Sequence, residues 1–270
     1  MMNSPLSKVL FSLAAYAVIS GAQAQTVNPI PVVNDDWRFS ASINGWASAS
    51  YATITQDKHS FGSTNTIGDN LSNATSAALF SAEAHKGDWG MMADLVYWGV
   101  NDGSKSAYAS GGDGSIYAGA NAKTTQTILT GAATYTAYKS NALYLDGLAG
   151  LRYISSTSVL NANANWDALG NVNAISRSFS SDMHSTDAIV GFKGRYRLAD
   201  TSWFVPFYAD AGKGPASNNT TWQLLAGVGD AFSWGDVTLS YRALGFDLPD
   251  RFGGTKYTSA GPQLAATVNF

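Results

Sequence analysis

The final segment of the chain alternates apolar and polar residues up to its last position. The apolar set, spaced two apart, is Leu264, Ala266, Val268 and Phe270, and the intervening set is Gln263, Ala265, Thr267 and Asn269. Alternation with a period of two places each set on its own face of a β-strand. Chain ends usually fray, so a strand that keeps its pattern to a terminal aromatic residue predicts that this end is held in a sheet.

The same alternation recurs from Trp37 onward and predicts an all-β fold of about ten strands. In the first strand Trp37, Phe39 and Ile43 share one face with Tyr51. The expected strands are Trp37–Tyr51, Asn73–His85, Trp89–Val100, Thr125–Tyr138, Ala142–Ser155, Thr186–Leu198, Trp203–Ala211, Thr221–Phe232, Val237–Phe246 and Ser259–Phe270. Eight or twelve strands remain open, because the second has an ambiguous apolar face and the seventh carries Pro206.

The predicted connections differ in length according to their order along the chain. Tight turns are expected at Lys86–Asp88, Lys139–Asn141, Ala199–Thr201 and Trp234–Asp236. The other connections are long and polar: Ala52–Ser72, Asn101–Thr124, Ser156–Ser185, Gly212–Thr220 and Asp247–Thr258. Short periplasmic turns and long extracellular loops are typical of an antiparallel transmembrane β-barrel.

Charged residues of the strands keep to the polar side of the alternation, which predicts that they face the lumen. A charge on the lipid-facing side at mid-depth costs about 2 to 4 kcal/mol. The predicted lumen charge network is Arg38, Glu83, Asp94, Asp146, Arg152, Lys193, Arg195, Asp210 and Arg242, with Asp187 and Arg197 on the same side. A barrel of this size is narrow, so we expect a plugged or very narrow lumen, with Lys193 paired to Asp210.

Aromatic residues gather at both ends of the predicted strands, as expected at two membrane–water interfaces. The periplasmic set is Trp37, Trp89, Trp203, Trp234 and Phe270, and the outer set is Tyr51, Tyr97, Tyr153 and Trp222. Trp46, Trp98 and Phe246 take the inward side near the outer end. These three side chains either pack against one another in the lumen or form an aromatic surface beneath the loops that binds a ligand.

The N-terminus has the pattern of a secretory signal peptide. Met1–Lys8 carries one positive charge, Val9–Ser20 is apolar, and Ala22–Ala24 supplies the small residues before a cleavage site. We therefore expect a signal peptide at residues 1–24, a periplasmic segment at 25–36 and a barrel at 37–270. The chain has no Cys, which excludes disulfides and thiol nucleophiles. Its net charge of −3 does not suggest nucleic-acid binding.

Together these features resemble Gram-negative outer-membrane barrels of the small-porin and OmpA-barrel type. The segment Asp187–Tyr196 and the pair Tyr241–Arg242 are similar to uncharacterised members with the same strand spacing. The resemblance implies an outer-membrane location, contact with membrane lipids and lipopolysaccharide, and insertion by the barrel assembly machinery through the strand that ends at Phe270. We expect no cofactor, and the sequence leaves the oligomeric state open.

For function, the sequence favours a non-enzymatic barrel with an envelope structural role, a surface-interaction role, or a narrow channel for small solutes. The alternative is an outer-membrane hydrolase. Asp182 and His184 resemble the Asp-x-His pair of omptin proteases, but no second acidic pair matches, and the alternation places both residues on the lipid-facing side. The His-x-Ser pattern of lipid A deacylases is not met, since Thr186 holds the Ser position. No Cys or His spacing suggests a zinc site.

Overall fold

The computed structural model describes residues 27–56, 59–111, 114–168, 171–216, 219–250 and 253–270. The expected signal peptide at 1–24 lies outside these ranges. The described part contains one short helix, α2 (Ile67–Asn73), and no helix in it is long and apolar enough to cross a membrane. The strands are β1 (Trp37–Trp46), β2 (Ala49–Gln56), β3 (His59–Asn65), β4 (Ala74–Lys86), β5 (Trp89–Gly111), β6 (Gly114–Lys139), β7 (Leu143–Ala168), β8 (Asn171–Arg197), β9 (Trp203–Lys213), β10 (Thr220–Phe232), β11 (Gly235–Asp250) and β12 (Gly253–Asn269).

The sheet closes on itself into an antiparallel barrel, because β1 pairs with both β4 and β12. Strands β1 and β2 are two parts of one wall strand, and β3 pairs only with β2 above the wall, so the twelve strands form a ten-stranded barrel. At the seam, the backbone groups of Phe39 and Phe270 exchange hydrogen bonds of 2.7 and 2.9 Å. Their rings stack with centroids 5.8 Å apart. The terminal aromatic residue therefore holds the first and last strands together, and the predicted fold class is confirmed.

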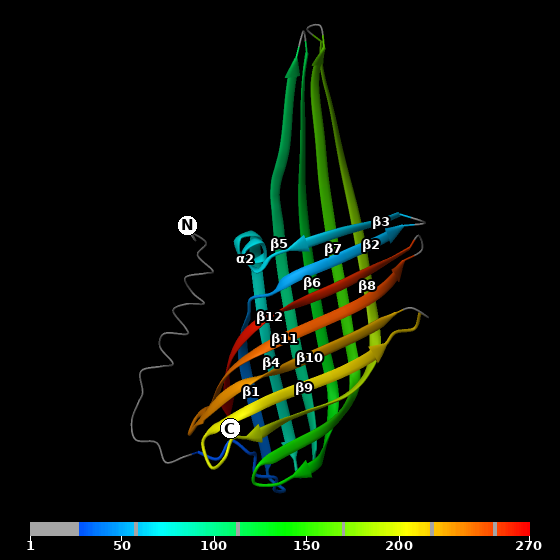
Figure 1. The fold of residues 1–270 in the computed structure, drawn as a ribbon. Coiled ribbons are helices and arrows are strands. Elements are labelled where there is room, and N and C mark those ends of the chain that lie inside the picture. The colour runs from blue at the N-terminus through cyan, green and yellow to red at the C-terminus, as the bar shows by residue number, and fades with distance from the viewer. Residues whose placement is uncertain (1–26, 57–58, 112–113, 169–170, 217–218, 251–252) are drawn as a thin grey trace.

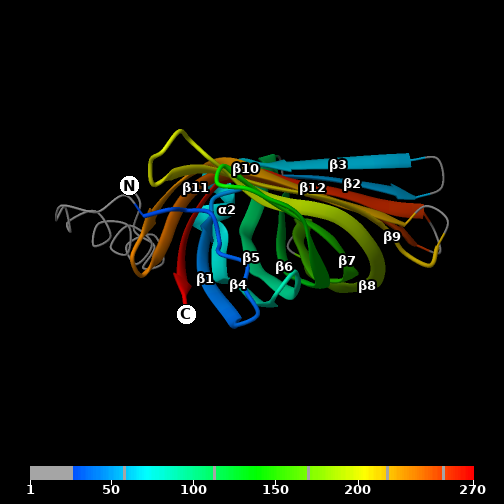
Figure 2. The same ribbon diagram turned by 90° about the horizontal axis from the view of Figure 1, so that it is seen from below.

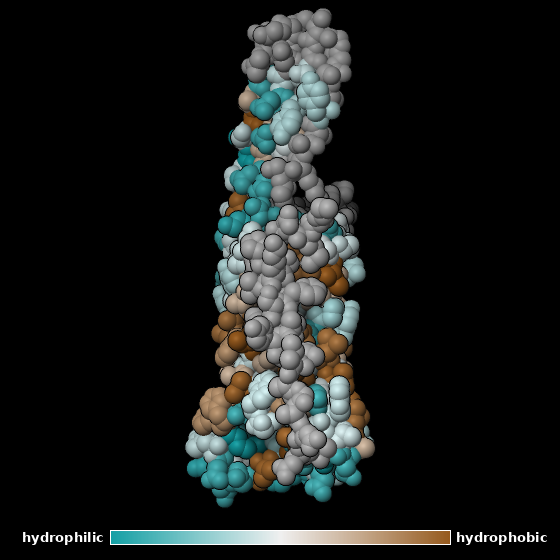
Figure 3. Space-filling model, turned by 90° about the vertical axis from the view of Figure 1, so that its left-hand side faces the viewer, coloured by the Kyte–Doolittle hydropathy of each residue, from teal (hydrophilic) through white to brown (hydrophobic). Residues whose placement is uncertain are grey.

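Large apolar side chains cover the outside of the barrel wall. Figure 3 shows them gathered over the lower half of the molecule, with hydrophilic residues along the base and along the upper extension. The exposed set includes Ile43, Met91, Leu129, Leu151, Val190, Phe192, Leu239 and Val268. Trp37, Trp89, Trp203 and Trp234 are also exposed and lie at the end where the short turns are. A band of this kind fits the outward-facing apolar belt of a membrane barrel.

Three of the tight turns contain a residue with a positive φ, and one of these is Gly235 at the β10–β11 turn, with a φ of 156°. Gly87, at the β4–β5 turn, has a φ of 58°, which a residue without a Cβ adopts freely. Ala199, at the β8–β9 turn, has a φ of 49°, although it carries a Cβ. Tight turns at these positions agree with the sequence prediction.

The prediction that the long connections are loops is wrong for three of them. In the connection Asp247–Thr258, residues 247–250 continue β11 and residues 253–258 belong to β12. Residues 101–111 and 114–124 continue β5 and β6, and residues 156–168 and 171–185 continue β7 and β8. Figure 1 shows these four strands as an extension, which we call the upper sheet, that rises far above the rest of the wall. Their composition, rich in Ser, Asn and Gly, is typical of loops. They stay in the sheet because each of them pairs with an equally long neighbouring strand.

The connection Ala52–Ser72 is also structured. It contains the end of β2, all of β3 and most of α2. A capping box starts the helix: the Thr66 side chain accepts a hydrogen bond from the Asp69 backbone, and the Asp69 carboxylate accepts from the Thr66 backbone. Asn70 is buried and donates to the Ser48 carbonyl at 2.8 Å. The helix thereby lies against the break between β1 and β2.

Candidate functional site

The lumen is crossed by a layer of hydrogen-bonded polar side chains, and its first pair is Arg152 on β7 with Asp210 on β9. The two guanidinium Nη atoms donate to the two carboxylate oxygens at 2.9 and 2.5 Å, and both side chains are fully buried. Arg152 also donates to Thr130 and Thr221 at 3.1 Å. Such bidentate pairing is the strongest geometry available to a buried ion pair. It bridges two strands that β8 separates.

The second pair, Arg242 on β11 with Asp94 on β5, is part of a closed ring of hydrogen bonds. The Nη2 atom of Arg242 donates to Asp94 at 2.5 Å. Asp94 accepts from Ser81 at 3.0 Å, and Ser81 accepts from Asn44 at 3.0 Å. Gln263 completes the ring, because it donates to Asn44 at 3.3 Å and accepts from Arg242 at 3.4 Å. Arg242 and Asp94 stand on strands that are not neighbours, so this pair crosses the lumen.

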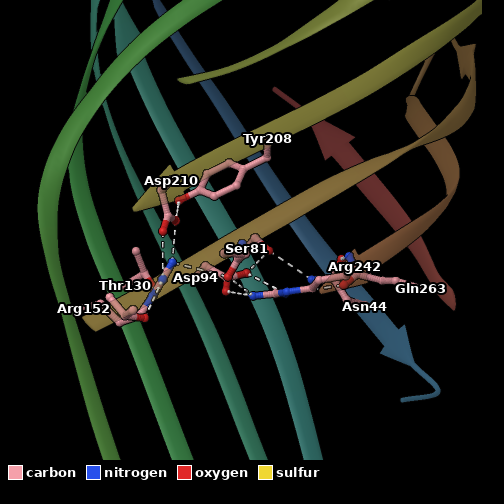
Figure 4. Close-up of polar contacts among 11 residues, drawn as sticks. Asn44, Ser81, Asp94, Thr130, Arg152, Tyr208, Asp210, Arg242 and Gln263 are labelled. Atoms are coloured by element: carbon pink, nitrogen blue, oxygen red, sulfur yellow. Dashed lines mark hydrogen bonds and ion pairs between the residues drawn. The ribbon is translucent and has the colours of Figure 1, made fainter. Parts of the chain in front are cut away.

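Gln223 on β10 connects the two arginine pairs. Its side-chain oxygen accepts from Arg242 at 2.9 Å and from Arg152 at 3.4 Å. Figure 4 shows the two guanidinium groups directed toward one another, with Asp94 between them. Strands β1, β4, β5, β6, β7, β9, β10, β11 and β12 each contribute a side chain. We call this network the polar layer.

A second group of charges lies nearer the short turns. The ammonium group of Lys193 on β8 pairs with Glu83 on β4, and His85 lies 3.2 Å from the same carboxylate. The prediction that Lys193 pairs with Asp210 is wrong. The prediction assumed that charged residues pair with residues of neighbouring strands. In the narrow lumen Lys193 instead reaches across to Glu83 on β4, and Asp210 pairs with Arg152.

The first described residues of the chain fill the opening at this end of the barrel. Pro29 and Ile30 are buried, and the Pro29 carbonyl accepts from Arg195 at 3.1 Å. Arg195 also contacts Asp236 at 3.2 Å and lies over the Phe204 ring. Figure 2 shows the N-terminal segment running across the lower mouth. We call residues 27–36 the N-terminal stopper.

Above the polar layer the lumen is filled by buried apolar side chains, here the apolar cluster. Its members are Trp46, Leu79, Val96, Ile128, Ile154, Leu244, Phe246 and Leu248. The Arg242 guanidinium lies 5.3 Å from the centre of the Trp46 ring, so the cluster rests directly on the polar layer. Of the three aromatic residues expected at the mouth, Trp46 and Phe246 belong to this cluster, and Trp98 is half-buried beyond it.

The remaining predicted lumen charges do not belong to the polar layer. Arg38 is at the rim near the short turns, where it donates to the Gly87 carbonyl at 3.4 Å. Asp146 is fully buried and faces Lys193 in the β7–β8 register. Asp187 is fully buried and accepts from Ser185 at 2.5 Å. Within the described ranges, no group of three or more His, Cys, Asp or Glu residues is placed to hold a metal ion.

Asp182 and His184 both point to the outside of the barrel. Their side chains are exposed, while Ser185 and Asp187, which have the opposite alternation, are buried. The alternation predicts this orientation, which keeps the omptin-like pair out of the lumen.

Sequence reasoning missed the neutral members of the polar layer and the N-terminal stopper. Gln223, Gln263, Asn44 and Ser81 stand on the polar side of their strands, but so do many amides and hydroxyls that make no such contacts. Ile30 stands before the first strand and has no periodic pattern around it. A buried polar ring therefore leaves a signal in the sequence only through its charged members.

One comparison with a solved structure agrees with the architecture. The outer-membrane protease OmpT from Escherichia coli superposes with a TM-score of 0.51 and 9% identity, covering 90% of this chain and all of that one. The fold is that of an outer-membrane β-barrel. A Pseudomonas aeruginosa FadL homologue matches with a TM-score of 0.32, 9% identity and coverage of 87% of this chain and 90% of that one. The attachment invasion locus protein Ail of Yersinia pestis matches with a TM-score of 0.27 and 11% identity, covering 84% of this chain and 97% of that one. No protein-family model and no curated protein matches the sequence.

Proposed function

We propose that this outer-membrane barrel is non-conducting and acts at the cell surface through its upper sheet. The observation that carries the proposal is the polar layer, in which Arg152–Asp210 and Arg242–Asp94 are joined by Gln223 across the lumen. The upper sheet is the largest part of the molecule beyond the outer aromatic residues Tyr97 and Tyr153. A closed lumen and a tall outer projection favour surface interaction over solute passage.

The energetics of the polar layer support a closed resting state. Removing one partner of a buried ion pair typically costs about 3 to 5 kcal/mol, because the other charge is left without compensation. Opening a path at this depth separates several such contacts at once. The apolar cluster above and the N-terminal stopper below occlude the same axis, so a rearrangement of one layer alone leaves the lumen closed.

Planar bilayer recording tests the proposal. Refolded protein, with its β content verified by circular dichroism, is expected to give no conductance steps. Steps that change in size with Gln223→Ala, a substitution inside the polar layer, would contradict the proposal and favour the narrow channel. Leu239→Ala on the exposed outside of β11 is the control, since it alters a side chain remote from the lumen.

We also propose that the barrel is not a hydrolase that uses His184. The exposed position of His184 on the outside of β8 supports this, because a general base has to reach its substrate together with a positioned partner. Hydrolysis of peptide and lipid substrates by the wild type and by His184→Ala is expected to equal the background of empty vesicles. Activity that the substitution abolishes would contradict the proposal.

A further inference from the structure

The two faces of the upper sheet differ in chemistry. Residues two apart share a face, so the buried Ile154 on β7 and Ile189 on β8 identify the face that continues the lumen, here the inner face. The register along β6, β7 and β8 has no bulge in the upper sheet, so this assignment extends to its top. The outer face carries Asn161, Asn163, Asn165, Ser176, Ser178 and Ser180, together with the exposed Tyr108 and Tyr117. Its amides and hydroxyls suit contact with water.

The inner face carries a partly uncovered apolar strip, with the polar Asn173 opposite Trp166 in the register and Ser158 nearer the barrel. Ala118, Ala164 and Ile175 form one row across three strands, and Ala162 and Trp166 flank that row on β7. Ile175 is 43% exposed and Trp166 is 38% exposed. Figure 1 shows why: the wall that carries β2 and β3 ends far below the top of the upper sheet. A contiguous exposed apolar patch on a water-facing part of a protein is typical of an interaction site.

One cation lies beside this apolar strip. Arg177 follows Ile175 on the same face and is exposed, and none of the ion pairs between side chains that the structure describes includes it. It pairs in register with Ala162, so a negative group bound to the guanidinium has apolar side chains directly next to it. Toward the barrel the same face reaches Met183, which packs against the apolar cluster. The strip from Arg177 to Trp166 covers roughly 13 Å along the strands.

We propose that the inner face of the upper sheet binds a long-chain fatty acid, with its carboxylate on Arg177 and its hydrocarbon chain on Ala162, Ala164, Trp166 and Ile175. This deepens the proposed function, on which it rests, by naming the class of surface ligand. The strip lies beyond Tyr153, at the outer interface, so lipids held in the membrane do not reach it. The ligand therefore comes from the external medium.

Quenching of tryptophan fluorescence by a brominated fatty acid tests the proposal on protein refolded in amphipol, where no bilayer competes. We expect saturable quenching in the wild type and loss of its saturable part in Trp166→Phe. Arg177→Gln is expected to weaken binding roughly two- to fivefold, the range for an exposed ion pair. It is expected to leave binding of the brominated alcohol of equal length unchanged. Asn165→Ala, on the outer face of the same strand, is the matched control and is expected to bind as the wild type does.

Three outcomes would overturn the proposal. The first is quenching that does not saturate, or that is equal in the wild type and in Trp166→Phe. Either result means that the fatty acid partitions into the sample without binding at the strip. The second is equal weakening of the acid and the alcohol by Arg177→Gln. The third is quenching that disappears as protein concentration rises, because a second copy of the chain then covers the strip. None of them bears on conductance, so the closed-lumen proposal stands or fails separately.

Discussion

The side-chain oxygen of Gln223 accepts hydrogen bonds from two buried arginines, Arg242 at 2.9 Å and Arg152 at 3.4 Å. Each guanidinium is also paired with its own carboxylate, Asp94 or Asp210. A neutral acceptor between two cations contributes a dipole that both share. It joins the two ion pairs into one hydrogen-bonded network.

Gln223→Met keeps the length of the side chain and removes the shared acceptor. We expect the free energy of unfolding to fall by about 1 to 3 kcal/mol, since buried guanidinium donors lose a partner. Urea unfolding of the wild type and the variant in lipid vesicles measures this change in unfolding free energy. Gln126→Met is the matched control: Gln126 is buried on the lumen side but lies outside the polar layer. An equal loss in the two variants would show that the shared acceptor has no special role.

The Arg152–Asp210 pair allows a double-mutant cycle. Arg152→Met alone is expected to cost about 3 to 5 kcal/mol of unfolding free energy, because it leaves the Asp210 carboxylate buried without a cation, although the Tyr208 hydroxyl still donates to it. Adding Asp210→Leu is expected to recover most of this loss, since well-packed apolar residues often replace a buried pair without a penalty. If the two single losses simply add, the carboxylate and the guanidinium do not stabilise each other.

The N-terminal stopper can be probed by thiol labelling, because the chain has no natural Cys. Ile30 is 7% exposed, whereas Val32, two residues along, is 74% exposed. A maleimide added from the turn side is expected to modify Ile30→Cys at least about tenfold more slowly than Val32→Cys, since opening must precede reaction. Equal rates would mean that the segment does not occupy the mouth.

The depth of the membrane follows from the apolar band. Val190 lies on the outside of β8 between Tyr196 and Thr186 and is 66% exposed. Val190→Arg is therefore expected to lower the unfolding free energy in lipid vesicles by about 2 to 4 kcal/mol. Ser178→Arg, on the outer face of the same strand in the upper sheet, is expected to change it by less than about 0.5 kcal/mol. If Ser178→Arg lowered the unfolding free energy as much as Val190→Arg, the membrane would have to reach the upper sheet at the level of Ser178.

The sequence predicts which way a side chain points better than what it touches. Alternation is local, so the inward direction of Asp146, Arg152 and Arg242 follows from their own strands. Partners depend on the stagger of the whole barrel. Arg242 and Asp94 are 148 positions apart and meet only when ten strands close with one particular register. The pairing of Lys193 with Glu83 escaped prediction for the same reason.

The extent of the strands was underestimated where apolar residues are small. Ala162 and Ala164 alternate with Asn161, Asn163 and Asn165, so the period of two continues through β7 with little hydrophobic contrast. Alanine contributes weakly to a hydrophobic pattern and has a low preference for strands. In the upper sheet, pairing between long neighbouring strands sets the structure, and that information is not local to any one of them.

Ala199→Gly is expected to stabilise the barrel, because Ala199 adopts a φ of 49° in the β8–β9 turn. The left-handed conformation costs a residue with a Cβ about 1 kcal/mol or more, and glycine adopts it freely. Part of the gain is lost to the greater entropy of glycine in the unfolded chain, so a net increase of roughly 0.5 kcal/mol in unfolding free energy is expected. Ala142→Gly, in the β6–β7 turn where the backbone has a negative φ, is expected to destabilise instead. A loss of stability in both variants would show that the turn holds Ala199 without strain.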